Sequence, residues 1–188
     1  KKRKIKLLKE ANYYTEEIRR IIKKNYGFDK LYAEGLYIKS ALDVDYQLHA
    51  LSALRAGIES YDRRHGWRGA LLNSKNDKNW KKKLKQKKTD ISLGWKFAEI
   101  IDVNDSEITF NIVNEKARGT IKSANLKWAI KKTIYDSFKI NDVIFVSKNS
   151  KNNWELKQYP KVNGAIVAIN PYNGKVKALV GGFSFESS

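Results

Sequence analysis

The stretch Trp95-Lys96-Phe97-Ala98-Glu99-Ile100-Ile101-Asp102-Val103 has a period of two residues. In an extended chain its odd-numbered residues share one face and its even-numbered residues share the other. Four of the five odd-numbered residues are large and apolar, so the pattern predicts a β-strand whose odd-numbered face points inward. Glu99 falls on that face, where it is expected either to act as a general base beside a partner group or to be solvated beyond a β-bulge.

Outward from this strand, Asn104-Asp105 marks a turn and further short runs predict four more strands. These strands are predicted at residues 108–112, 117–121, 143–146 and 154–159, with a short helical connector at residues 125–130. Three strands, a connector and two strands follow the order of the OB-fold, a five-stranded barrel. Pro160 ends the last strand, because proline donates no ladder hydrogen bond. Residues 92–160 are therefore expected to form a self-contained OB-like domain.

Two helices are predicted before this domain. The first covers residues 13–26, with Gly27 as its stop, and the second runs from Asp43 or Asp45 to near Gly66. The apolar stripe of the second helix is predicted at Leu48, Leu51, Leu54, Ile58 and Tyr61. The lysine-rich residues 73–89 are expected to form either a short helix held by Trp80 and Leu84 or a mobile loop.

The C-terminal residues 164–182 predict a β-hairpin around the turn Pro171-Tyr172-Asn173-Gly174. Both strands are almost continuously apolar, so they are expected to be buried on both faces by layers that lie beyond Ser188. An isolated hairpin is only marginally stable in water, and the apolar residues 36–42 are predicted to form a third strand beside it.

The predicted fold class is α+β: a five-stranded OB-like β-barrel lobe plus a small linker lobe of helices on a short antiparallel sheet. Four regions are predicted: a linker at residues 1–66, a basic connector at residues 67–91, the OB-like domain at residues 92–160 and the hairpin at residues 161–188.

Composition sets further limits. The chain has 188 residues, a formal net charge of +18 and no cysteine, which excludes disulfides and thiolate metal sites. No apolar run of the length of a membrane span occurs. The positive charge predicts attraction to polyanions, either nucleic acid, anionic lipid headgroups or acidic polymers of the cell envelope. The alternative is that the lysines only solvate the surface.

Four blocks in order along the chain resemble class A penicillin-binding proteins, particularly those of the 1A type. They are Tyr14-Thr15-Glu16-Glu17-Ile18-Arg19-Arg20, the run at residues 35–43, Tyr61-Asp62-Arg63-Arg64-His65-Gly66-Trp67-Arg68-Gly69, and the run at residues 164–183. The resemblance implies a parent with peptidoglycan glycosyltransferase and serine-type D-Ala-D-Ala transpeptidase domains. This chain is then expected to be a fragment that joins the two domains, on the periplasmic side of a bacterial inner membrane, with the membrane anchor upstream.

The implied transpeptidase motifs are Ser-x-x-Lys, Ser-x-Asn and Lys-Thr-Gly. Neither Ser-x-x-Lys nor Lys-Thr-Gly occurs, and the four Ser-x-Asn matches are expected by chance in a chain rich in these residues. The chain is therefore predicted not to be an enzyme. No cofactor is expected, and no metal site, because His49 and His65 are the only histidines and neither belongs to a Glu-x-x-His or His-x-x-x-His motif.

The function implied by the resemblance is that of a spacer and docking surface in a peptidoglycan synthase. Its implied partners are the rest of the synthase, nearby peptidoglycan, and regulators such as an outer-membrane lipoprotein activator. Arg63, Arg64 and Arg68 are the candidate docking residues, because guanidinium groups pair with carboxylates. In the structural alternative these arginines stabilise the C-terminal end of the long helix.

The second functional hypothesis is a basic OB-fold module that binds single-stranded nucleic acid by stacking bases on tryptophan. Trp95, Trp128 and Trp154 are instead expected to belong to the core of the barrel, so nucleic acid is not among the predicted partners.

Overall fold

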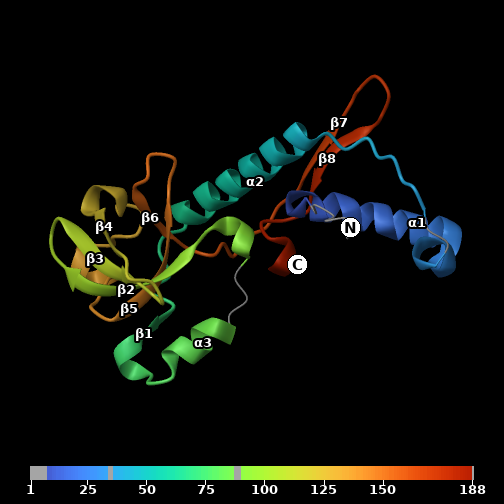
Figure 1. The fold of residues 1–188 in the computed structure, drawn as a ribbon. Coiled ribbons are helices and arrows are strands. Elements are labelled where there is room, and N and C mark those ends of the chain that lie inside the picture. Colours follow the sequence, from blue (N-terminus) through green and yellow to red (C-terminus); the bar gives the residue numbers. More distant parts are fainter. Residues whose placement is uncertain (1–7, 34–35, 87–89, 188) are drawn as a thin grey trace. The chain divides into compact units, whose positions relative to one another are not determined.

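A computed structural model describes residues 8–33, 36–86 and 90–187 (Figure 1). The lysines of residues 1–7, Gly35 and residues 87–89, on which some expectations rest, lie outside the described residues. Residues group into two compact units: unit 1 comprises Lys1–Ile58 and Val162–Ser188, and unit 2 comprises Glu59–Lys161.

Helices and antiparallel sheets both occur, as the predicted α+β class requires. The helices are α1 (Asn12–Tyr32), α2 (Val44–Arg64), α3 (Trp80–Gln86) and α4 (Ile134–Ser137). The strands are β1 (Leu72–Asn73), β2 (Lys96–Val103), β3 (Glu107–Ile112), β4 (Arg118–Lys122), β5 (Asp142–Lys148), β6 (Trp154–Lys157), β7 (Ile166–Ile169) and β8 (Val176–Val180). Short 3-10 turns lie at Lys9–Ala11, Ser74–Asn76, Ile91–Leu93, Ser123–Asn125 and Phe185–Ser187.

Unit 2 is built on one antiparallel sheet. Its strand order is β1-β5-β2-β3-β4, and β6 pairs with β5 outside this path. The five predicted strands are confirmed as β2 to β6, and β1 is an additional short strand that the sequence pattern missed. The connector predicted at residues 125–130 is not a helix, since residues 127–129 form a turn. The helical pieces flank it: the 3-10 turn Ser123–Asn125 before it and the one-turn helix α4 after it, which begins at a capping box between Thr133 and Asp136.

The hydrogen-bonded ladder of this sheet does not close into the predicted five-stranded barrel, since no β4–β6 pairing occurs among the described strands. A side chain fills the gap instead. The Trp154 ring of β6 lies against Gly119 of β4, where an added Cβ would lie 2.5 Å from the indole Nε1. The Trp154 ring also meets Phe110 edge-on at 5.7 Å. The seam between β4 and β6 is therefore held by packing.

The main core of unit 2 lies on the even-numbered face of β2, which corrects the predicted inward face. Ala98 and Ile100 are fully buried, whereas Glu99 is half-buried on the opposite face and accepts a hydrogen bond from the Ser74 hydroxyl. A register shift between Ile100 and Asp102 marks a β-bulge. The opposite face carries a smaller second core, made by Trp80 and Leu84 of α3 against Val143 with Leu71, Leu72, Phe97 and Val113 around them.

In unit 1 the regular turns of α1 break at Gly27, which has φ 85° and ψ 174°. This confirms Gly27 as the predicted break, because that backbone conformation is open chiefly to glycine. A further helical stretch follows it to Tyr32. The predicted hairpin is also confirmed: β7 and β8 pair antiparallel around the turn at residues 170–174.

The third strand predicted at residues 36–42 is wrong, because this segment forms neither strand nor helix and Tyr37 is 94% exposed. The free edge of β8 is bound by α2 instead. The Gln47 side chain accepts from the Leu179 amide at 2.9 Å and donates to the Leu179 carbonyl at 3.0 Å. The Asp43 amide donates to the Lys177 carbonyl at 2.9 Å. One side-chain amide thus satisfies backbone groups that a neighbouring strand would otherwise pair.

The buried stripe of α2 also differs from the predicted one. Leu54 and Ile58 are buried as predicted, but Leu48 and Tyr61 are more than 40% exposed. The buried positions of the helix are Gln47, Ala50, Leu54, Ile58 and Asp62. The two ends of the stripe are polar, because Gln47 and Asp62 each form several specific hydrogen bonds.

Candidate functional site

The most connected polar group in the described residues is Asp62, in the last turn of α2 within unit 2. The residue is 3% exposed, and its carboxylate accepts two hydrogen bonds from the Arg68 guanidinium, at 2.8 and 3.0 Å. It also accepts from Gln158 Nε2 at 2.8 Å and from the Lys161 amide at 3.1 Å. We call these four residues the Asp62 network. Its geometry is that of a bidentate arginine–carboxylate pair with two further donors.

The Asp62 network ties together two segments that are far apart in sequence. Gln158 also accepts from the Arg68 amide at 2.9 Å and donates to the Gly66 carbonyl at 3.2 Å. Arg68 in turn donates to the Tyr159 carbonyl at 2.6 Å. The point where the chain leaves α2 and the point where it leaves β6 are therefore bound to each other.

Two opposing effects determine the ionisation state of the Asp62 carboxyl group. Burial alone would raise the pKa of Asp62, but hydrogen bonds from Arg68, Gln158 and the Lys161 amide outweigh it, so the net pKa lies below its usual range. The carboxylate is thus ionised and paired at neutral pH. This group is structural, since its lone pairs are occupied by four donors.

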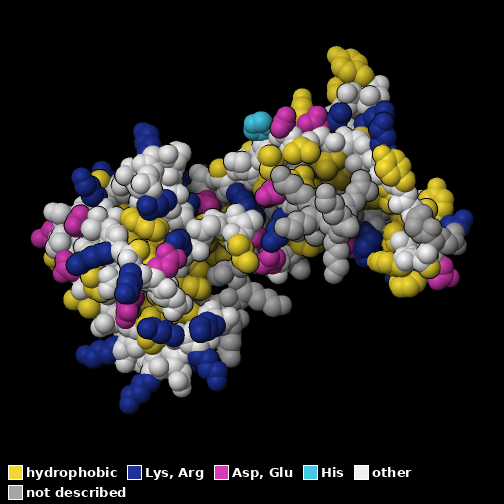
Figure 2. Space-filling model, viewed as in Figure 1, with side chains coloured by type: hydrophobic (Ala, Val, Ile, Leu, Met, Phe, Trp, Pro, Cys, Tyr) yellow, Lys and Arg dark blue, Asp and Glu magenta, His cyan; other side chains and the backbone are white. Residues whose placement is uncertain are grey.

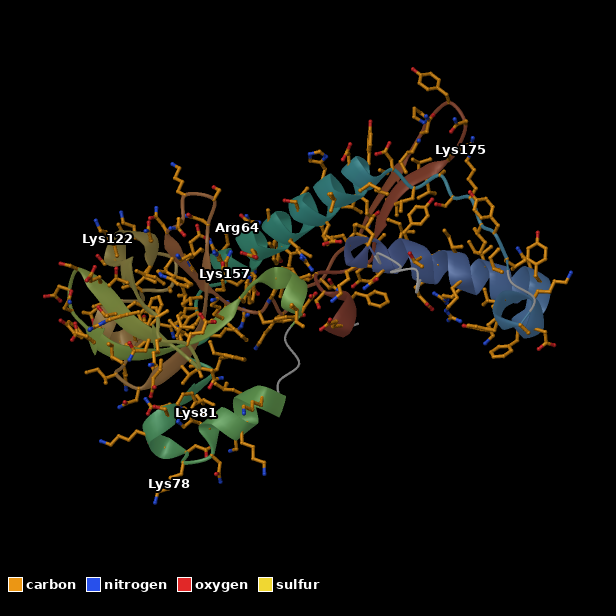
Figure 3. All side chains as sticks on the ribbon, in the orientation of Figure 1. Arg64, Lys78, Lys81, Lys122, Lys157 and Lys175 are labelled. Atoms are coloured by element: carbon orange, nitrogen blue, oxygen red, sulfur yellow. The ribbon has the colours of Figure 1, made fainter. Side chains whose placement is uncertain are left out.

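The three candidate docking arginines have different surroundings (Figure 3 labels Arg64). Arg68 belongs to the Asp62 network. Arg63 lies 5.2 Å over the Trp128 ring and donates to the Leu156 carbonyl, with Glu59 and Glu155 within 4 Å. Arg64 is exposed, and its guanidinium lies 5.3 Å over the Tyr61 ring. Only Arg64 presents its charge mainly to solvent.

The tryptophans of unit 2 pack mainly against protein. Trp67 belongs to the main core, and its ring meets Trp128 at 5.8 Å and Phe138 at 5.8 Å. Trp128 and Trp154 are partly buried against the same core, and Trp95 packs on Phe145 and Tyr159. The Trp67 Nε1 is buried and has no hydrogen-bond partner among the described residues.

Groups with catalytic potential are scattered. The Ser-x-Asn serines lie in a 3-10 turn, at the start of another, at the end of β5 and in the turn after β5. His49 and His65 are both exposed on or just after α2. In residues 8–33, 36–86 and 90–187 no cluster of three histidine or acidic side chains could hold a metal ion. Within the same residues, no helix combines the length and apolar character needed to cross a membrane.

Comparison with known proteins places these features in a family. The family described as "Penicillin-binding protein OB-like domain" matches residues 67–162, just over half of the chain. This chain belongs to the penicillin-binding proteins of the 1A type. The resemblance seen in the four sequence blocks is thereby confirmed.

Relatives named Penicillin-binding protein 1A align with nearly all of this penicillin-binding protein chain. The protein of Rickettsia typhi is 37% identical over 183 residues, and that of Escherichia coli is 28% identical over 197 residues. Each alignment covers 95% of this chain but only 23% and 22% of the relative. A crystal structure of Penicillin-Binding Protein 1A from Haemophilus influenzae matches with a TM-score of 0.75 and 26% identity, over 95% of this chain and 27% of that one.

Three residues with structural roles are not indicated as important by the sequence of this penicillin-binding protein chain. They are Asp62, Gln158 and Gln47, because a buried polar residue looks like any surface residue in a hydrophobicity pattern. One signal was available for Asp62: it continues the spacing of Leu54 and Ile58 by a further four residues.

Proposed function

We propose that this chain is the non-catalytic linker and OB-like accessory region of a bifunctional peptidoglycan synthase. In this proposal it acts as a spacer and as a docking surface for regulators. The observation that carries the proposal is the Asp62 network, which binds the two ends of the OB-like domain together. A domain whose ends meet can be inserted into a larger protein without separating the flanking segments.

The proposed setting is the periplasmic side of the bacterial inner membrane. The partners we propose are the glycosyltransferase and transpeptidase domains of the same protein, nearby peptidoglycan, and regulators such as an outer-membrane lipoprotein activator. Among the candidate docking residues, Arg64 is the best placed, because Arg63 and Arg68 already form internal ion pairs and hydrogen bonds.

The nucleic-acid hypothesis has less support. Stacking needs aromatic rings open to the bases, and Trp67, Trp128 and Trp154 pack on the core of unit 2. The accessory role is therefore the one we propose.

An excision in the natural full-length protein tests the spacer role. Residues 67–160 would be replaced by a flexible Gly-Ser bridge of about four residues. A short bridge suffices because the Lys161 amide, just after one cut point, donates to Asp62, which lies only four residues before the other. Acylation by a fluorescent penicillin should persist, while cross-linking of newly made glycan should fall. Loss of acylation in a folded variant would show that the region is part of the transpeptidase site.

A charge reversal tests docking separately. Arg64→Glu in the full-length protein should weaken activation by its regulator, with basal acylation unchanged. The matched control is Arg118→Glu, at another exposed arginine, on β4. An equal response of the two variants would remove Arg64 from the docking surface.

A further inference from the structure

The most concentrated charge on unit 2 lies on α3 and the turn before it. We define the lysine face as Lys75, Lys78, Lys81, Lys82, Lys83 and Lys85, all of which are exposed. Figure 2 shows dark-blue side chains gathered over the region that α3 occupies in Figure 1. Between residues 74 and 86 the only acidic residue is Asp77.

The lysine face is almost unneutralised. Asp77 pairs with Lys83 at 2.6 Å. The remaining five lysines have no ion pair among the described residues, and Lys81 only lies over the Trp80 ring at 5.3 Å. Like charges this close repel one another, so the arrangement costs folding energy and favours binding of an anionic surface.

The attachment of α3 explains how the lysines stay presented. A helix of seven residues is too short to be stable alone. Trp80 and Leu84, one turn apart, are buried against Val143 of β5 and hold the helix on the sheet. Both large apolar side chains of α3 are thus buried against the sheet, and its lysines are exposed to solvent.

The type of cation indicates the type of partner. Residues 69–90 contain no arginine. Arginine is enriched and lysine depleted in protein–protein interfaces, and arginine is the residue that pairs bidentately with carboxylates. Attraction to anionic lipid headgroups needs only positive charge near the surface, without bidentate pairing, and a lysine cluster supplies that charge. Single-stranded nucleic acid would need an open ring for stacking, but Trp80 is 9% exposed.

We propose that the lysine face binds the surface of an anionic phospholipid bilayer. Binding is electrostatic and without insertion, because Trp80 and Leu84 are committed to the sheet. It is therefore reversible and weakens with salt. This inference goes beyond the proposed docking of regulators and needs only the chain itself, so the two can fail separately.

The test is co-sedimentation of the full chain with vesicles of phosphatidylcholine containing one-third phosphatidylglycerol, with pure phosphatidylcholine for comparison. Each lysine near an anionic surface contributes about fivefold to the partition coefficient. The variant K81Q/K82Q/K85Q should therefore lose about 100-fold in partition coefficient, and raising the salt should remove binding of the native chain.

The matched control is K122Q/K127Q/K132Q, which removes the same charge from exposed lysines of β4 and the segment after it. Figure 3 shows Lys122 on the other side of unit 2 from Lys78 and Lys81. The control should change the partition coefficient by less than about fivefold. Equal losses in the two variants would mean that net charge alone acts. The proposal would also be overturned if the native chain bound a single-stranded oligonucleotide, supplied at the same total negative charge as the vesicles, but did not bind the vesicles.

Discussion

At the scale of single residues, two buried polar side chains of α2 form specific hydrogen bonds, which an apolar stripe cannot form. Gln47 and Asp62 occupy core positions of α2, and each donates to or accepts from backbone and side-chain groups of distant segments. A buried polar group is costly unless all its partners are present, so such residues specify one arrangement of the chain.

Asp62→Asn should destabilise unit 2 by about 2 kcal/mol, because the partly exposed Arg68 loses its bidentate partner inside a buried network. All five tryptophans lie in residues 59–161, so tryptophan fluorescence during urea unfolding reports unit 2 alone. Glu115→Gln is the control, since its ion pair with Lys96 is almost half exposed. That control should change the unfolding free energy by less than about 0.5 kcal/mol. A silent Asp62→Asn would contradict the role of the network.

The difference in unfolding free energy between the native chain and Asp62→Asn should depend on pH, and the pKa of Asp62 fixes the sign of this dependence. The Asp62 pKa is lowered in the folded chain, so the unfolded state binds the proton first as pH falls. The stabilisation is fully present above the ordinary aspartate pKa of about 4 and is lost as pH falls through the lower, folded pKa. The gap in unfolding free energy between the native chain and Asp62→Asn should therefore narrow below about pH 4. A gap that stays constant to pH 2 would show that the charge of Asp62 does not matter.

At the scale of elements, the β7–β8 hairpin is held by a helix. Gln47→Ala leaves the Leu179 amide and carbonyl without their side-chain partners and should cost about 2 kcal/mol. Hydrogen exchange at the Leu179 amide should accelerate accordingly. Leu48→Ala, one residue along and 41% exposed, should leave that exchange unchanged. If Leu179 stays protected in Gln47→Ala, another group must cover the β8 edge.

The seam of unit 2 predicts a second element-scale effect. Gly119→Ala would place a Cβ within 2.5 Å of the Trp154 indole, and overpacking of this kind costs about 1–3 kcal/mol. Gly57→Ala is the contrasting control, because nothing lies within 4 Å of its added Cβ and alanine favours a helix by up to about 1 kcal/mol. The first variant should melt at a lower temperature and the second should not. A neutral Gly119→Ala would mean that the β4–β6 seam is loose.

The strands were predictable from the sequence, but their faces and partners were less so. The period of two residues and the turn residues locate β2 to β6 to within about two residues. The inward face of β2 is hard to assign from the sequence because Phe97 is partly buried in the second core, beside Trp80 and Leu84 of α3, so both faces of the strand carry apolar residues. The strand predicted at residues 36–42 does not form. Its apolar character cannot indicate that the edge of β8 is already hydrogen-bonded to Gln47. The spacing of Leu54, Ile58 and Asp62 indicates a buried position for Asp62, but its partner Gln158 lies 96 residues away and no local pattern indicates that pairing.

At the scale of the whole molecule, the OB-like domain depends on residues before its first predicted strand. Trp67 and Ala70 belong to the main core, and β1 pairs with β5, although all three precede residue 92. The Asp62 network adds the end of α2. We therefore expect the folding unit to be Glu59–Lys161, and the predicted boundary at residue 92 to be too late for a stable piece.

Hydrogen exchange of two excised pieces tests this central claim directly. In residues 59–161, with Trp67 and the Asp62 network present, the amides of β2, β3 and β5 should be protected as one cooperative unit. In residues 92–160, which lack both, the same amides should exchange much faster, because loss of a buried tryptophan alone costs about 3–5 kcal/mol. Equal protection in the two pieces would contradict the claim that the ends of the OB-like domain, joined at Asp62, hold it together.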